Sequence, residues 1–209
     1  MLILFRKIFA VGVVVVLSGC SGKGELPNFT TEGVISPAAS CAIDPRTFSD
    51  AESLGTHGTG ACSVRDAWRI RAMAGVTFSQ PAIVNCAVAN GFRQWLAEVV
   101  QPASAVHFGA RVSKVTIAAS YACRPRNGRS GAKLSEHGFG NAIDVSGFTL
   151  ADGRELVVEN YQPAAFFKSV RSAACGLFKT VLGPGSDASH RDHFHFDLAY
   201  RRSGKNYCD

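Results

Sequence analysis

Two short segments of the chain hold most of its histidines, together with carboxylates. The first contains His137 and Asp144, and residues 190–197 contain three more histidines and two aspartates. Four of the six histidines in the chain therefore fall in these two segments. Two or three imidazoles and a carboxylate can hold a catalytic zinc ion, with three protein ligands and one position open to water. A lone aspartate is commonly a turn former and a lone strand histidine a core residue, so the clustering is what indicates a metal site.

The local backbone must bring these side chains together. Gly138 and Gly140 lie between His137 and Asp144 and allow a tight turn from an expected loop into an expected strand. In the second segment, residues two apart share one face of a strand. We therefore expect His193 and His195 to project the same way, while the phenylalanines that alternate with them enter the core.

Hydrophobic periodicity outside these segments predicts an α+β domain. Apolar residues at intervals of three and four predict helices over residues 81–100 and 166–178. Short apolar runs between turn residues predict strands at residues 114–120, 142–146, 155–159, 180–182 and 194–198. A chain of 209 residues fits one such domain plus an export segment.

The N-terminus has the order of regions found in secretory signals. Arg6 and Lys7 precede an apolar run, which ends at Leu17-Ser18-Gly19-Cys20. The alternative is a membrane-spanning helix, but that needs about 20 apolar residues and this run is shorter. We therefore predict a signal peptide over residues 1–19 and a flexible tether, rich in Gly, Pro, Ser and Thr, over residues 20–40.

The end of this segment resembles the bacterial lipobox. The resemblance implies cleavage before Cys20, acylation of its thiol and attachment to a membrane through that lipid. Ser21 follows, and the lack of Asp at this position resembles an outer-membrane address among sorted lipoproteins. The expected location is the periplasmic face of a membrane, with the outer membrane favoured in a Gram-negative cell.

The remaining six cysteines predict disulfides. They are Cys41, Cys62, Cys86, Cys123, Cys175 and Cys208. An even set in an exported protein is typical of a disulfide framework, and no Cys-x-x-Cys pair is present to form a thiolate zinc cluster. Six cysteines allow about 15 pairings, among which the sequence does not choose.

The charge of the chain does not distinguish most classes of partner, although the pattern of basic residues argues against nucleic acid. The formal net charge is +6, and it includes two basic residues of the expected signal peptide. A mild basic excess suits an anionic wall or lipid surface and is equally ordinary as solvated surface. No basic run is interleaved with aromatic residues, so we expect no nucleic-acid partner.

Both histidine segments resemble motifs of known families. Residues 135–144 resemble the Ser-x-His-x-x-Gly-x-Ala-x-Asp motif of D-alanyl-D-alanine carboxypeptidases, and residues 192–195 resemble the second motif of that superfamily. The superfamily also includes penicillin-insensitive murein endopeptidase and the hedgehog signalling domain. A closer resemblance, over roughly residues 41–208, is to the bacterial extensin-like C-terminal domain family. It is carried by residues 123–127, 135–137, 181–187 and 190–197.

The resemblance implies a fold and a metal centre. The fold would be zinc-peptidase-like, with a small central, mostly antiparallel sheet flanked by helices and stabilised by disulfides, in a domain spanning residues 41–209. A Zn²⁺ ion would be held by His137, Asp144 and His195. The implied activity is hydrolysis of peptide bonds in peptidoglycan stems or cross-links, so peptidoglycan peptide is the expected partner.

The resemblance also implies catalytic roles. Asp192 matches the acidic base of carboxypeptidase relatives and ranks slightly ahead of His193, which forms the His-x-His pair of endopeptidase relatives. An extended strand would turn Asp192 away from His195, so the choice between them depends on local geometry. Arg124 matches an arginine that stabilises the developing oxyanion, with an ordinary surface arginine as the alternative.

Two functions from other classes compete with hydrolysis. One is a non-catalytic module that keeps the metal for structure and binds the cell wall, and the other is a disulfide-stabilised structural lipoprotein whose histidines bind no metal. The sequence has no Gly-x-Ser-x-Gly elbow, phosphate loop or dinucleotide fingerprint.

Overall fold

The computed structural model describes residues 41–209. The predicted signal peptide over residues 1–19, acylation of Cys20 and the tether over residues 20–40 lie outside the described residues. Within the described part of the chain, no helix is long and apolar enough to cross a membrane.

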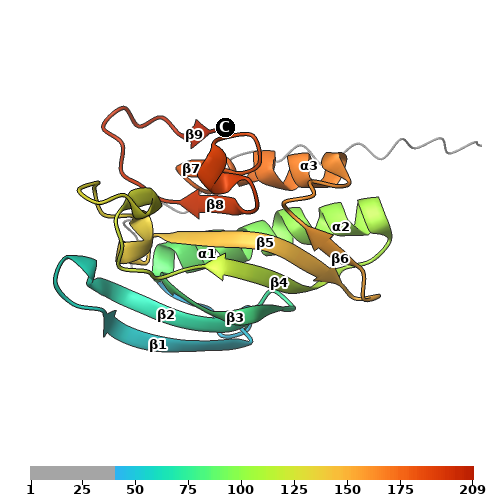
Figure 1. Cartoon of the computed structure of the whole chain (residues 1–209). Coiled ribbons are helices and arrows are strands. Elements are labelled where there is room, and N and C mark those ends of the chain that lie inside the picture. Colours follow the sequence, from blue (N-terminus) through green and yellow to red (C-terminus); the bar gives the residue numbers. More distant parts are fainter. Residues whose placement is uncertain (1–40) are drawn as a thin grey trace, which may run out of the picture.

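One mixed sheet of nine strands organises the domain (Figure 1). The strands are β1 (Asp50–His57), β2 (Val64–Met73), β3 (Val76–Asn85), β4 (Val112–Ala119), β5 (Ala142–Leu150), β6 (Glu155–Val157), β7 (Thr180–Leu182), β8 (Phe194–Asp197) and β9 (Tyr207–Cys208). Their order is β1-β2-β3-β4-β5-β8-β7-β9, with β6 paired to β5. Only β3 with β4 and β7 with β9 run parallel, so the expected α+β class and mostly antiparallel sheet are confirmed within the described chain. The sheet is larger than predicted, because the prediction did not include β1, β2 and most of β3.

The helices pack on one face of this sheet (Figure 1). Helix α1 (Cys86–Gln94) continues through a π-helical segment, η2 (Trp95–Val100), into α2 (Gln101–Phe108), and α3 (Ala164–Ala174) lies beside them. The shorter 3-10 turns are η1 (Gly60–Cys62), η3 (Arg126–Gly128), η4 (Glu136–Phe139) and η5 (Ala188–His190). Trp95 is fully buried at the centre of the layer, where its indole N–H donates to the carbonyl of Val170 at 2.8 Å. Burial of this size, with its polar atom satisfied, favours a single packed core.

The predicted helix over residues 81–100 begins too early. Residues 81–85 finish strand β3, with Ala82 and Val84 facing the core, and the helix starts at Cys86. The boundary is set by Asn85, whose extended backbone and side-chain oxygen cap the helix by accepting from the Val88 N–H at 2.9 Å. A run of apolar residues fits both periods, so periodicity alone did not find this change of element.

Three disulfides join segments that are distant in sequence, which confirms the predicted framework. The pairs are Cys41–Cys86, Cys62–Cys123 and Cys175–Cys208. The third joins the end of α3 to β9 and so fixes the C-terminal segment against the sheet.

Candidate metal site

Two central strands place a carboxylate opposite a histidine. In the β5–β8 ladder, Asp144 pairs with His195 and Ile143 pairs with Phe196. Side chains alternate between the faces of a strand, so the core position of Ile143 and Phe196 directs Asp144 and His195 to the opposite face. Both polar side chains are nonetheless buried.

The turn before β5 adds His137. This residue lies in η4, which is capped at its C-terminus by Gly140 in the left-handed conformation, with φ of 59°. The carbonyl of Gly140 accepts from the Asn85 N–H at 2.7 Å, which ties the turn to the sheet. The predicted tight turn between His137 and Asp144 is therefore present, and glycine supplies the φ that it requires.

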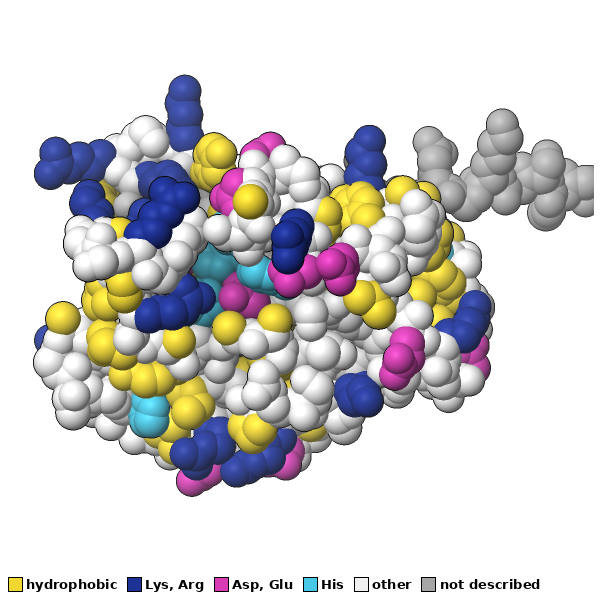
Figure 2. All heavy atoms as spheres, viewed as in Figure 1, with side chains coloured by type: hydrophobic (Ala, Val, Ile, Leu, Met, Phe, Trp, Pro, Cys, Tyr) yellow, Lys and Arg dark blue, Asp and Glu magenta, His cyan; other side chains and the backbone are white. Residues whose placement is uncertain are grey.

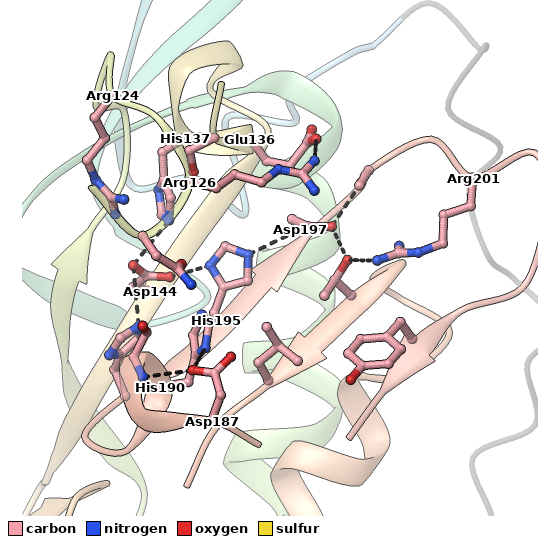
Figure 3. A pocket seen from close by; sticks show the side chains of 18 residues that line it. Arg124, Arg126, Glu136, His137, Asp144, Asp187, His190, His195, Asp197 and Arg201 are labelled. Carbon is pink, nitrogen blue, oxygen red and sulfur yellow. Dashed lines mark hydrogen bonds and ion pairs between the residues drawn. The ribbon is translucent and has the colours of Figure 1, made fainter. Parts of the chain in front are cut away.

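The three side chains converge on one point (Figure 3). His137 Nε2 lies 3.1 Å from Asp144 Oδ2, and His195 Nδ1 lies 2.8 Å from Asp144 Oδ1. One ligand atom from each residue lies within 4.8 Å of the others, and all three residues are buried. The group could therefore hold a metal ion.

Outer hydrogen bonds orient both imidazoles. His137 Nδ1 donates to the carbonyl of Ser120 at 2.6 Å, and His195 Nε2 donates to Asp197 Oδ2 at 3.0 Å. Each ring therefore turns its other nitrogen toward Asp144. Metal-binding histidines typically show this arrangement, in which the second ring nitrogen donates to a carbonyl or carboxylate. The residues present thus fit a metal ion in donor type and in orientation.

Charge pairing overcomes burial at this site. Burial alone would raise the pKa of Asp144, but hydrogen bonds from His137 and His195 hold that pKa well below its usual range. Burial alone would lower the pKa of His195, but its bonds to Asp144 and Asp197 raise that pKa to about 9. In the metal-free protein at neutral pH, His195 therefore carries a proton on Nδ1, the atom that faces Asp144.

His193 faces the same site, whereas Asp192 does not. His193 Nε2 lies 3.7 Å from Asp144 Oδ2, and His193 lines the cleft. Its Nδ1 donates at 2.8 Å to Asp192, a half-exposed residue that lines a neighbouring depression instead. The hydrogen bond from His193 lowers the pKa of Asp192, so this carboxylate is a weaker base than a free one. Of the two candidate bases, the structure brings only His193 to the metal-binding group.

His190 adds a further imidazole beside His195. Their ring centroids are 5.4 Å apart, and His190 Nδ1 donates to Asp187 at 2.8 Å. Burial lowers the pKa of His190, and neighbouring imidazoles add to this effect against the opposing effect of Asp187. Asp187 thus orients His190, while His190 lines the cleft.

An open cleft of about 460 Å³ gives access to these residues. Figure 2 shows histidine side chains on its floor, with arginine side chains around it. Arg124 lines the cleft, and Figure 3 shows its guanidinium directed toward His137 and Asp144. Arg126 lies on the same wall and pairs with Glu136 at 3.2 Å. The cleft therefore combines a carboxylate–imidazole floor with a cationic wall.

Comparison with protein-family models decides the relationship of the chain. The model described as "Extensin-like protein C-terminus" matches residues 40–209. The chain belongs to the extensin-like family. Comparisons with curated proteins and with solved structures gave no significant match.

Among the residues of the extensin-like cleft that were not predicted as site residues, three are linked to His195 by hydrogen bonds. They are Thr180, Asp197 and Arg201, which lie in or next to β7 and β8. A signal existed for Asp197, since it lies two residues after His195 and must share its face of the strand. No comparable signal marked Thr180 or Arg201, because their proximity depends on how β7 and the C-terminal segment pack.

Proposed function

We propose that this extensin-like protein is a zinc-dependent peptidase that hydrolyses peptide bonds of peptidoglycan stems or cross-links. The observation that carries the proposal is the convergence of His137, Asp144 and His195 at the floor of an open cleft, with both imidazoles already oriented by outer hydrogen bonds. A His₂–carboxylate donor set is typical of catalytic zinc sites that leave one position open. Its resemblance to the carboxypeptidase motif supports the reaction class.

A bound zinc ion would supply a Lewis acid that activates water and polarises the scissile carbonyl. Side chains of the protein would transfer the proton of the attacking water. His193 faces Asp144 and the cleft, so its Nε2 would take the proton of the attacking water and later return it to the leaving amine. Asp192 accepts a hydrogen bond from the Nδ1–H of His193 and thereby keeps Nε2 available. This arrangement favours His193 as the base and gives Asp192 an orienting role.

Arg124 would stabilise the negative charge that develops on the carbonyl oxygen. Within residues 41–209 its guanidinium forms no hydrogen bond or ion pair, although it lines the cleft and points toward the histidines. An arginine remains charged at all relevant pH values and can aim several donors at one oxygen. Arg126, by contrast, is engaged with Glu136.

The cell-wall assignment rests on compartment as well as chemistry. Three disulfides are typical of oxidising compartments such as the periplasm. The predicted signal peptide would direct export, and the lipid on Cys20 would hold the mature domain on the periplasmic face of a membrane, within reach of peptidoglycan. A membrane-tethered enzyme in this compartment could therefore act on a substrate that is fixed in the cell wall.

Hydrolysis tests this function directly. The full-length protein, purified in detergent and loaded with one equivalent of zinc, is incubated with peptidoglycan sacculi and with purified muropeptides, and released fragments are identified by mass spectrometry. We expect cleavage of a peptide bond, and we expect His193→Gln to reduce its rate by about 10²- to 10⁴-fold while zinc remains bound. Asp192→Asn should reduce the rate less, because it removes only an orienting contact.

His57→Ala is the matched control, because this histidine lies in β1 and does not line the cleft. It should leave hydrolysis at the wild-type rate. A zinc-loaded wild-type protein that sediments with sacculi but releases no fragment would refute hydrolysis and indicate a wall-binding module. Full activity of His193→Gln would refute the assigned base.

A further inference from the structure

His195 is connected to the C-terminal segment by a continuous hydrogen-bond chain. Its Nε2 donates to Asp197 Oδ2, and the other carboxylate oxygen accepts from the hydroxyl of Thr180. The same hydroxyl accepts from the guanidinium of Arg201 at 2.9 Å. Figure 3 shows this chain leading away from the cleft floor toward Arg201.

We propose that Asp197, held by Thr180 and Arg201, is the positioning carboxylate that directs the Nδ1 lone pair of His195 to the metal. The inference rests on the proposed metal-dependent function and extends it beyond the three ligands. None of the three residues offers a ligand to the group formed by His137, Asp144 and His195. Each of them instead influences the metal-binding group through the hydrogen bond that it makes to the next residue toward His195.

The direction of every hydrogen bond in the chain is determined by chemistry. Arg201 can only donate, so it occupies a lone pair of the Thr180 oxygen and turns the single hydroxyl proton toward Asp197. Asp197 accepts that proton and also accepts from the N–H of Ala199 at 2.9 Å. Both of these bonds fall on Oδ1, which leaves Oδ2 to accept from the Nε2–H of His195.

Burial makes this chain strong. Thr180, Asp197 and His195 are all buried, so their hydrogen bonds do not compete with bulk water. A carboxylate that accepts from a ligating imidazole fixes the ring orientation and raises the basicity of the nitrogen that binds the metal. Without Asp197, the ring of His195 would be free to rotate about its side-chain bonds or to present the other tautomer.

The C-terminal segment of the protein anchors the outer end of this hydrogen-bond chain. Arg201 also donates to the carbonyl of Lys179 at 3.1 Å, and its guanidinium lies over the ring of Tyr207, 5.9 Å from the centroid. Strand β9 pairs with β7, and the Cys175–Cys208 disulfide holds it there. The C-terminal segment thus supports the metal-binding group although it lies outside the two histidine segments.

Zinc affinity tests the proposal without relying on activity. The full-length protein and its variants are stripped of metal, and the zinc dissociation constant is measured by competition with a chromophoric chelator. We expect Asp197→Asn to weaken zinc binding roughly 10- to 100-fold and Thr180→Val to weaken it roughly tenfold. Thr180→Ser retains the hydroxyl and should bind zinc as tightly as the wild type does. Thr77→Val is the control outside the cleft and should leave the zinc affinity unchanged.

The rescue by Thr180→Ser separates positioning from folding. A merely structural role would lower the melting temperature of the metal-free variants and leave the zinc dissociation constant of the folded protein unchanged. Wild-type affinity in both Asp197→Asn and Thr180→Val would therefore overturn the proposal while leaving the metal site intact. If Asp197→Asn does not fold, the Thr180→Val and Thr180→Ser pair decides alone. A wild-type protein that binds no zinc would overturn the proposed function as well.

Discussion

Protonation of His195 should make zinc binding depend on pH. Its pKa in the metal-free protein is raised to about 9, so below that pH zinc must displace a proton from Nδ1. We expect the apparent zinc affinity to rise roughly tenfold per pH unit between about pH 7 and pH 8.5, and to level off above about pH 9. Chelator competition at several pH values measures the slope. His57→Ala should retain it, and an affinity that does not change over this range would show that His195 is neutral before the metal binds.

The residues that could bind a metal were visible in the sequence, but most of the residues that orient them were not. His137, Asp144 and His195 were predicted from clustering and motif resemblance, and the structure brings them together. Alternation along a strand tells which side chains share a face, so Asp197 was within reach of the same argument. Thr180 approaches Asp197 only because β7 pairs with β8, and such lateral pairing is not encoded in local periodicity.

Elements with regular periods were predicted better than the irregular hairpin at the N-terminal end of the sheet. Strands β5, β7 and β8 begin at the predicted residues. In β2, however, the buried residues Val64, Ala67, Ile70 and Met73 are three apart, and the β1–β2 register shifts along the ladder. Such irregular pairing disrupts the two-residue alternation by which strands are found, while β1 buries almost nothing.

The turn that connects η4 to β5 should be sensitive to a small substitution. A Cβ at Gly140 would lie 2.9 Å from Val64 Cγ1 and 3.0 Å from the backbone nitrogen of Asn85, besides adopting a positive φ. Gly109 ends α2 with nearly the same backbone conformation, but a Cβ there meets nothing within 4 Å. Gly109→Ala should therefore lower the free energy of unfolding by about 1 kcal/mol, the cost of the left-handed conformation alone.

Gly140→Ala should lower that free energy by more than Gly109→Ala does, and it alone should weaken zinc binding, because the displaced turn carries His137. Urea unfolding of the metal-free proteins and zinc titration of the folded ones provide the two measurements. Equal destabilisation by both substitutions, with zinc affinity unchanged, would mean that the turn relaxes without moving the histidine.

At the scale of the whole molecule, the cleft is assembled from segments far apart in the chain. Its lining comes from residues 124–144, from residues 180–197 in and around β7 and β8, and from the C-terminal residues Ala199, Arg201 and Tyr207. The β5–β8 ladder joins the first two, whereas the last depends on β9 and a disulfide. Cysteine count predicted that disulfides form, but not that one of them would brace a wall of the cleft.

Removing individual disulfides should separate global stability from the metal site. Replacing both Cys175 and Cys208 by Ser frees a cross-link with a sequence separation of 33, and replacing Cys41 and Cys86 frees one with a separation of 45. Because loop-closure entropy depends weakly on length, each change should lower the free energy of unfolding by a similar amount, about 4 kcal/mol. Only the first loosens the segment that carries Arg201, so only it should also weaken zinc binding, by roughly threefold to tenfold. Zinc titration at a temperature where both variants remain folded gives the comparison. Equal zinc affinities in the two variants would show that β-pairing and Arg201 hold the C-terminal wall without the cross-link.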